Sequence, residues 1–358
     1  MVSSRQKIQR RKYKLYHLRF KGNHYDIGVK RGKIFKKCNI KFPLNMDKFQ
    51  MNHGVESEKI LSQYFKEVCE EVKGITDTLE IDYYKFISWL LAMGCCMYNL
   101  EDNFPIEVRG CTAFAINYKN HMYYARNNDL PPYLKKGSKS EIYKITNRNK
   151  FNITTSSFIN GEEGINEKGL TVAMTFVGTK LEDIKPGFNS VFIVRYLLEK
   201  ANSIKDAKEL LLKLPVSSNC NILLADNSGD MIVVECSPKE KNIRKPIKIN
   251  DDLSVICTVN NFKTESMKKY EWDEKDEYNT NERYTNVISA FKNFSSEDII
   301  ECIKEVLKGN KGFMCQYDKS LNFETVWSSI FDLDSLTIYR SEGNPRKCKF
   351  IKDERLKR

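Results

Sequence analysis

The order of predicted elements beyond residue 110 most constrains how this chain can fold. Short, turn-bounded runs rich in β-branched and aromatic residues predict strands at 111–117, 121–126, 141–146, 151–159, 169–176, 221–225, 231–236, 254–259, 325–331 and 335–339. Helical patterns fall between them, near 190–200, 203–212, 282–291 and 297–307. The predicted order is a group of strands, two helices, more strands, two more helices and the final strands. This order is what two packed antiparallel sheets between helical layers would produce.

Residues 1–110 have a different pattern. Helices are expected at 25–37, 57–73 and 82–98, which makes this part a helical N-terminal segment in front of a layered domain at 111–358. The chain has 358 residues, a length that one large layered sheet domain can use in full.

Cys111 is the most informative candidate for chemistry, because the hairpin that it opens returns to an arginine. A two-residue loop at Tyr118 and Lys119 would place Cys111 opposite Arg126. Directly opposed Cβ atoms lie about 4.5–5.5 Å apart, and a guanidinium at that range stabilises a thiolate. The pattern predicts an activated cysteine at the start of a strand, whereas a lone cysteine in that position is usually a core residue.

The base that would activate this cysteine can be supplied in two ways. The chain has four histidines, none beyond residue 121, and His121 starts the return strand, far from Cys111 along the hairpin. Cleavage before Cys111 would instead free an α-amine, whose pKa of about 7.7–8.0 suits a general base. Gly110 fits this second route, because glycine takes conformations closed to other residues and lets a side chain approach its carbonyl. Both routes stay open at this point.

Four stretches of sequence match the motifs of one enzyme family, in that family's order. They are Gly22 to Gly28 with Arg31-Gly32, Gly110-Cys111-Thr112 with Arg126-Asn127-Asn128-Asp129, Gly161 to Leu170, and Thr258 to Phe262 with Arg283. With these stretches the chain resembles the N-terminal-nucleophile hydrolases of the penicillin acyltransferase-like group, related to choloylglycine hydrolases and acid ceramidases. The second stretch matches the nucleophile and its R-N-x-D partner motif. One short motif would be weak evidence, but four in order span most of the chain.

The resemblance implies an α+β fold, the four-layer αββα sandwich of two antiparallel sheets. It also implies that Cys111 is the nucleophile, first in self-cleavage after Gly110 and then on substrate. Arg126 would hold the thiolate, and Asp129 would orient the freed ammonium group. Residues 1–110 would become a small subunit and residues 111–358 a large one.

Further site residues follow from the last two stretches. Asn260 would donate its side-chain amide to the oxyanion, and Arg283 would complete the polar network. The chain departs from the family pattern at Thr175, where choloylglycine hydrolases often have asparagine, so that an oxyanion contact there would come from a backbone N–H or the hydroxyl. Asn261 replaces the histidine of the family's T-N-H-F motif, and the role assigned to Asn260 could shift to it.

Composition excludes several other classes. The net charge is +12, but no nucleic-acid module is recognisable and the aromatic residues are not interleaved with the basic N-terminal run. Eleven cysteines without C-x-x-C spacing suggest reduced thiols in a cytoplasm, and neither a metal site nor a cofactor is expected. No apolar run reaches the roughly 18–20 residues that span a bilayer, and the basic residues 1–19 lack the apolar core of a signal peptide.

The predicted function is that of an autoprocessed cysteine hydrolase or acyltransferase acting on a linear, non-peptide amide. Its substrate would be a small-molecule acyl amide or an acyl-CoA-like compound, and the processed fragments would stay associated. The oligomeric state stays open and includes a homo-oligomer. Two alternatives remain: an unprocessed cysteine hydrolase with His121 as base, and a non-enzymatic binding protein of the same fold.

Overall fold

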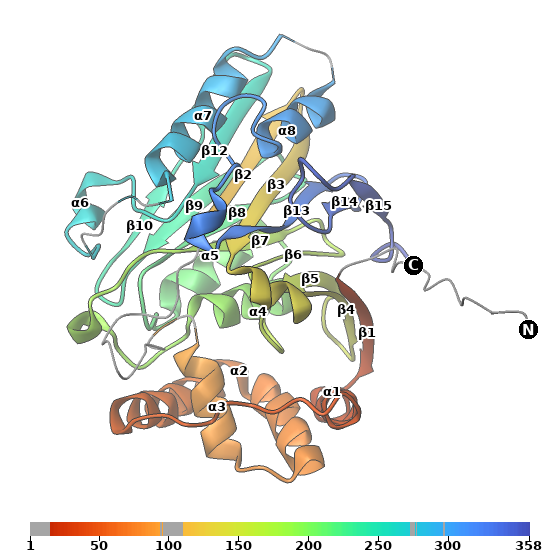
Figure 1. Ribbon diagram of the computed structural model, residues 1–358, viewed down its shortest axis with the longest axis vertical. Coiled ribbons are helices and arrows are strands. Elements are labelled where there is room, and N and C mark those ends of the chain that lie inside the picture. The colour runs from red at the N-terminus through yellow and green to blue at the C-terminus, as the bar shows by residue number, and fades with distance from the viewer. Residues whose placement is uncertain (1–14, 94, 96–109, 273–275, 277, 296–297) are drawn as a thin grey trace, which may run out of the picture.

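Two β-sheets pack face to face, and helices cover their outer sides (Figure 1). The computed structural model describes residues 15–93, 95, 110–272, 276, 278–295 and 298–358. The eight-stranded sheet has the order β1 (Tyr16–Gly22), β4 (Lys139–Ile145), β5 (Phe151–Thr155), β6 (Glu163–Asn166), β7 (Thr171–Phe176), β8 (Cys220–Ala225), β9 (Met231–Cys236) and β10 (Lys241–Arg244). The seven-stranded sheet has the order β11 (Ile247–Lys248), β12 (Leu253–Thr258), β2 (Gly110–Tyr118), β3 (His121–Leu130), β13 (Glu324–Asp332), β14 (Thr337–Ser341) and β15 (Ile351–Asp353).

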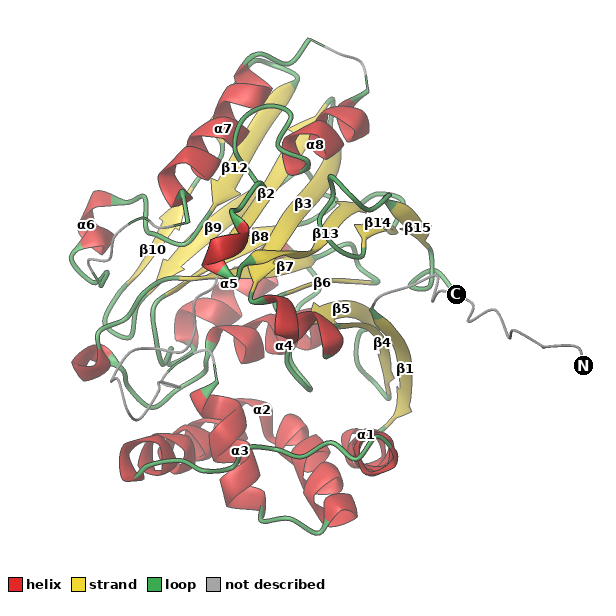
Figure 2. Cartoon of the chain, in the orientation of Figure 1, coloured by secondary structure: helices red, strands yellow, loops and turns green. Residues whose placement is uncertain are grey.

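The helices form the two outer layers, which Figure 2 shows in red around the yellow sheets. The eight-stranded sheet packs against α1 (His24–Lys37), α2 (Lys48–Leu79), α3 (Tyr83–Ala92), α4 (Ser190–Lys200) and α5 (Ile204–Lys213) in one large apolar core. The seven-stranded sheet packs against α7 (Thr280–Lys292) and α8 (Ile299–Leu307). The short α6 (Glu265–Lys268) buries Met267 in a small separate cluster with Val177 and Phe262. The predicted αββα sandwich is therefore confirmed.

Small side chains allow the two sheets to approach each other closely. Ala113 and Ala115 of β2 are fully buried in the core between the sheets, together with Ala173 of β7 and Leu223 of β8. Because successive strand residues point to opposite faces, Cys111 lies on the same face of β2 as these alanines. The nucleophile candidate is thus placed at the end of the interface between the sheets.

Several helix starts follow from their capping residues. Ser203 accepts a hydrogen bond from the Asp206 N–H at the start of α5, the cap that the sequence predicts. Asp47 and Gln50 form a reciprocal capping box at the start of α2.

The N-terminal segment is not purely helical. β1 comes before α1 and pairs in parallel with β4, while every other strand pair is antiparallel. Strands β6, β10, β11 and β15 were also not expected from the sequence, and the strand predicted at 151–159 ends at Thr155. The helix predicted at 82–98 ends at Ala92; residues 94 and 96–98 lie outside the described residues.

No helix in the described part of the chain is long and apolar enough to span a membrane.

Candidate active site

Cys111 lies at the start of β2 and is buried, with 1% of its surface exposed. The Arg126 Nη2 donates a hydrogen bond to its Sγ over 2.9 Å, and the thiol donates to Asn128 Oδ1 over 3.3 Å. The predicted contact between Cys111 and Arg126 is present. The predicted pairing is not, because Cys111 lies opposite Asn128 and Arg126 lies opposite Ala113.

The turn between β2 and β3 explains the different register. Lys119 and Asn120 both have positive φ, 52° and 62°, which is the conformation of a type I′ turn. The loop is therefore Lys119-Asn120 rather than Tyr118-Lys119, and the pairing shifts by two residues. A two-residue shift keeps every side chain on its original face, so that Arg126 still reaches Cys111.

Arg126 forms hydrogen bonds to both sheets next to the Cys111 thiol. Its side chain is fully buried, and besides Cys111 and Asn128 it donates to the backbone carbonyls of Met174 on β7 and of Glu162, the latter over 3.4 Å. Burial by itself lowers the pKa of Arg126, but the adjacent Cys111 sulfur and neighbouring carboxylates raise it above its usual range. The guanidinium therefore stays positively charged next to the sulfur.

Asn260 and Arg283 hold the backbone of Cys111. The Cys111 N–H donates to Asn260 Oδ1 over 2.7 Å, and Arg283 Nη1 donates to the Cys111 carbonyl over 2.6 Å. Arg283 also donates to Thr112 Oγ1 and to Asn260 Oδ1, over 2.8 and 3.1 Å. A helical arginine is usually solvated, yet Arg283 is fully buried because these acceptors face α7.

Gly110 lies where a larger residue would meet its neighbours. It is buried and pairs with Asp129. A Cβ at this position would come within 2.8 Å of the Phe323 ring and 3.3 Å of Asp129 Cβ. The surroundings of Gly110 therefore leave little room for a side chain at this position.

Asp129 lies on the other face of β3, away from the Cys111 sulfur. Its carboxylate accepts hydrogen bonds from Tyr317 Oη, over 2.9 Å, and from Thr325 Oγ1. Burial raises the pKa of Asp129 to about 6, against the opposing effects of Arg283, Thr325 and Tyr317. Asp129 pairs with Gly110, the residue that precedes Cys111.

This shift predicts how stability depends on pH. The folded-state pKa of Asp129, about 6, lies above its ordinary value of 3.8, so the folded state binds the proton more tightly. Its contribution is complete below pH 3.8 and is lost as the pH rises through 6, which lowers the free energy of unfolding by about 1.5 kcal/mol between pH 5 and 7.5. Urea unfolding of wild type and Asp129→Asn at both pH values measures this, and the variant should lack that part of the slope. Equal slopes in the two proteins would contradict the assignment.

Thr175 and Asn261 lie beside the loop that carries Asn260. The Thr175 hydroxyl donates to the Val259 carbonyl over 2.6 Å and lies 3.1 Å from the Thr258 hydroxyl oxygen. The Asn261 side-chain amide donates to Asn281 on α7 over 2.9 Å. Asn221, which the sequence did not single out, donates to the carbonyls of Val259 and Asn261 and thereby fixes the position of Asn260 between them.

Asn128 is the second site residue that the sequence did not single out. It is the variable position of the R-N-x-D motif, and the only sequence signal for it is that position, two residues beyond Arg126. In the structure it is fully buried and accepts from both Cys111 and Arg126.

All four histidines have partners away from Cys111. His17 contacts Glu342, His24 contacts Glu199, His53 contacts Ser57 and Cys95, and His121 contacts Asp332 and Asp334. His121 is at the turn end of the hairpin, seven residues along β2 from Cys111, or about 23 Å. His121, Asp332 and Asp334 form the one group among the described residues that is close enough to hold a metal ion, and that group lies at this distant end.

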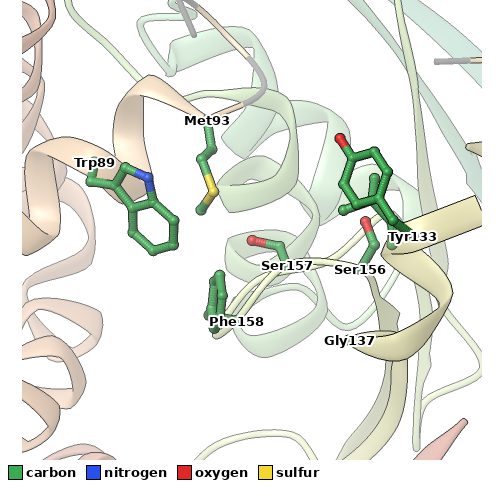
Figure 3. Close-up of a pocket in the computed structure, with 8 residues that line it drawn as sticks. Trp89, Met93, Tyr133, Gly137, Ser156, Ser157 and Phe158 are labelled. Atoms are coloured by element: carbon green, nitrogen blue, oxygen red, sulfur yellow. The ribbon is translucent and has the colours of Figure 1, made fainter. Parts of the chain in front are cut away.

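An apolar cavity of about 320 Å³ lies between the end of α3 and the segment that follows β5 (Figure 3). Its lining residues are Trp89, Met93, Tyr133, Leu134, Gly137, Ser156, Ser157 and Phe158. The figure shows Trp89, Met93 and Phe158 on one side and Tyr133 with Ser156 on the other.

Glu162 connects this cavity to the thiol. Its carboxylate accepts from the Ser156 N–H over 3.1 Å, and its carbonyl accepts from the same Arg126 that contacts Cys111. Two residues, Glu162 and Arg126, therefore link Ser156 of the cavity wall to Cys111 through hydrogen bonds.

Comparison with known proteins identifies related sequences and folds. A family model described as acyl-coenzyme A:6-aminopenicillanic acid acyl-transferase matches residues 116–347. Among solved structures, penicillin V acylase from Agrobacterium tumefaciens is 14% identical with a TM-score of 0.44, covering 65% of this chain and 83% of that one. A mutant conjugated bile acid hydrolase from Clostridium perfringens is 13% identical, with a TM-score of 0.44 and coverage of 69% and 93%.

A third structure is the N-acylethanolamine-hydrolyzing acid amidase ortholog of Caenorhabditis elegans, which is 15% identical with a TM-score of 0.46 and coverage of 62% and 93%. No curated protein matches the chain.

Proposed function

Because this chain belongs to the acyl-coenzyme A:6-aminopenicillanic acid acyl-transferase family, we propose that it is a self-processing hydrolase or acyltransferase of linear amides, with Cys111 as its nucleophile. One observation carries the proposal: the Cys111 thiol contacts a buried guanidinium, while Asn260 holds its backbone nitrogen and Arg283 its carbonyl. Three separate groups thus hold Cys111 in position. The residue before it is a glycine whose surroundings leave little room for a side chain.

Self-cleavage would come first. The Cys111 sulfur attacks the Gly110 carbonyl carbon, the C–N bond breaks, and the nitrogen takes up the thiol proton, which leaves a thioester. Water then hydrolyses that thioester, so that Gly110 gains a carboxylate and Cys111 regains its thiol and a free α-amine. Asn260 Oδ1, which accepts from the Cys111 amide in the uncut chain, would orient the new amine.

The same residue would then act on substrate. The α-amine accepts the thiol proton, the sulfur adds to the amide carbonyl, and the departing amine leaves with that proton. Water or a second amine resolves the resulting acyl thioester. Asn260 Nδ2 donates to the Phe176 carbonyl over 3.0 Å, and its second hydrogen could reach the oxyanion, a kind of donor worth roughly 3–4 kcal/mol.

The apolar cavity supports an apolar acyl group. Its walls are formed largely by the rings of Trp89, Tyr133 and Phe158 and by Met93, and its size lies at the lower end of small-molecule sites. In this proposal the acyl chain extends from the reacting carbonyl into the cavity, whose wall is linked to Arg126 through Glu162. We propose a medium-sized apolar acyl amide, or the corresponding acyl-CoA-like thioester, as the substrate class.

The two fragments would remain associated after cleavage, because buried ion pairs join them. Arg31 of α1 binds Glu141 of β4 through two hydrogen bonds of 2.9 and 2.8 Å, and Glu71 of α2 binds Arg195 of α4 over 2.8 Å. All four side chains are buried. Strand β1 adds seven residue pairs with β4.

Trapping of the acyl-enzyme tests the proposal. Purified protein is mixed with a panel of apolar acyl thioesters and amides, quenched in acid and analysed by mass spectrometry. We expect a mass increase of one acyl group on the fragment that begins at Cys111, and none in Cys111→Ala. His121→Ala, a matched control, should retain the label. Acylation that persists in Cys111→Ala, or that disappears in His121→Ala, would contradict the proposal.

A further inference from the structure

The amide group of Asn128 is held in one orientation beside the nucleophile. Its Oδ1 accepts from Arg126 Nε over 3.0 Å, from Arg126 Nη2 over 2.6 Å and from the Cys111 thiol over 3.3 Å. With three donors directed at one atom, that atom must be the oxygen, because an amide nitrogen would face them with its own hydrogens. The Nδ2 group therefore points away from Arg126.

This Nδ2 group has no hydrogen-bond partner in the described part of the chain, although it is buried. Buried side-chain donors in native proteins nearly always have an acceptor, and one that lacks it calls for a physical explanation. An aspartate would offer Arg126 the same acceptor oxygen without an unpaired donor. The unpaired donor is therefore a feature that folding alone does not explain.

The distances allow this donor to reach the reacting carbonyl. Since Oδ1 is 3.3 Å from Sγ, the nitrogen of the same amide is no more than about 6 Å from Sγ. A carbonyl carbon ready for attack stands about 3–3.5 Å from the nucleophile, and its oxygen can accept from a donor about 2.7–3.1 Å away. In the uncut chain Gly110 precedes Cys111 and pairs with Asp129, the residue that follows Asn128.

We propose that Asn128 Nδ2 donates a hydrogen bond to the oxyanion that forms when Cys111 adds to the substrate carbonyl. Sulfur addition moves the carbonyl π electrons onto oxygen, and the Nδ2 hydrogen stabilises that charge until the amine leaves and the carbonyl re-forms. The inference rests on the proposed function, and it makes Asn128 a catalytic residue beside Asn260. Its partner would be the carbonyl oxygen of a linear amide or thioester.

The competing explanation is that Asn128 only positions Arg126. Two substitutions separate the explanations, because they predict opposite orders of activity. Asn128→Asp keeps acceptor oxygens for Arg126 but replaces the donor with a second acceptor, whereas Asn128→Leu removes both. If the donor matters, Asn128→Asp is impaired at least as strongly as Asn128→Leu. If only positioning matters, Asn128→Asp is clearly the more active variant.

The readouts are chosen to separate the oxyanion from thiol activation. kcat is measured per processed chain, and the number of processed chains is counted by intact-mass spectrometry. The variants are compared with wild type at the same fraction of Cys111 thiolate. That fraction is obtained from the pH dependence of Cys111 alkylation by iodoacetamide. We expect kcat to fall by about 10²-fold in both variants with KM changed less than threefold. An apolar acyl aldehyde forms an adduct with Cys111 that places an oxygen where the oxyanion would lie. Its affinity for both variants should be lower than its affinity for wild type by a similar factor.

Two fallback measurements keep the role of the Asn128 donor testable. If Asn128→Leu does not fold, as judged by circular dichroism, Asn128→Ser replaces it. If a variant is cut too slowly to yield enough processed chain, its rate of self-cleavage becomes the readout and the same rank order applies. Asn128→Asp within threefold of wild type, beside a strongly impaired Asn128→Leu, would overturn the inference. Acylation of Cys111 in the wild type is a separate result, so that failure of the proposed function would be seen there first.

Discussion

Replacing Arg126 with methionine is expected to lower kcat/KM by about 10³-fold and the free energy of unfolding by about 3–5 kcal/mol. The kinetic effect follows because the guanidinium contacts the Cys111 sulfur directly, at 2.9 Å, and a thiolate without a neighbouring cation is far less populated near neutral pH. The stability effect follows because the carbonyls of Met174 and Glu162 and the Asn128 amide oxygen would lose their donor inside the sandwich.

Arg126→Lys provides the matched control. Lysine keeps the positive charge but offers a single ammonium in place of a planar fork, so it cannot serve the thiol, Asn128 and both carbonyls together. We expect an intermediate kcat/KM and an intermediate stability. Both quantities are measured by substrate kinetics and by urea unfolding. Retention of more than a tenth of wild-type activity in Arg126→Met would show that the thiol is activated in another way.

Replacing Arg195 with methionine is expected to destabilise the protein by about 3–5 kcal/mol without touching the site. Arg195 donates to Glu71 over 2.8 Å, to Glu199 over 3.2 Å and to the Ile159 carbonyl over 2.6 Å, and it is fully buried. Its loss would leave two buried carboxylates without their main counter-charge. Urea unfolding followed by circular dichroism measures the change.

The same variant also tests how the fragments are held together. Glu71 belongs to the proposed small fragment and Arg195 to the large one, so the processed variant should release the small fragment in size-exclusion chromatography at lower urea than wild type does. Lys36→Ala is the control, because it removes an exposed pair with Glu80 and should change neither measurement. Equal behaviour of Arg195→Met and Lys36→Ala would contradict a role for the buried pairs.

Much of the fold could be predicted because the local signals agreed with the tertiary structure. The strands around Cys111 and the helix that Ser203 caps have their expected types, since hydrophobic periodicity and turn residues specify them locally. Strand β1 could not be predicted in the same way. It is short, stands alone before a helix, and is stabilised by parallel pairing with β4, more than a hundred residues later.

Part of the site could likewise be predicted from the sequence, and part could not. The face shared by Cys111 and Arg126 was predictable, because a register shift of two residues preserves it, but the pairing itself depended on Lys119 and Asn120 adopting positive φ. Arg283 resembles a solvated helical residue in sequence and is buried only because Cys111 and Thr112 present acceptors to it. Asn128 occupies a variable motif position, and its unpaired Nδ2 exists only in three dimensions.

Intact-mass spectrometry of freshly purified wild type beside Cys111→Ala tests the central claim most directly. An N-terminal nucleophile requires a free amine on Cys111, and that amine exists only if the chain is cut. We predict two wild-type masses that meet at the Gly110–Cys111 bond, and a single uncut mass in Cys111→Ala. A single full-length mass in both proteins, together with a wild type that still acylates substrate, would show that the amine is never freed and would contradict the mechanism.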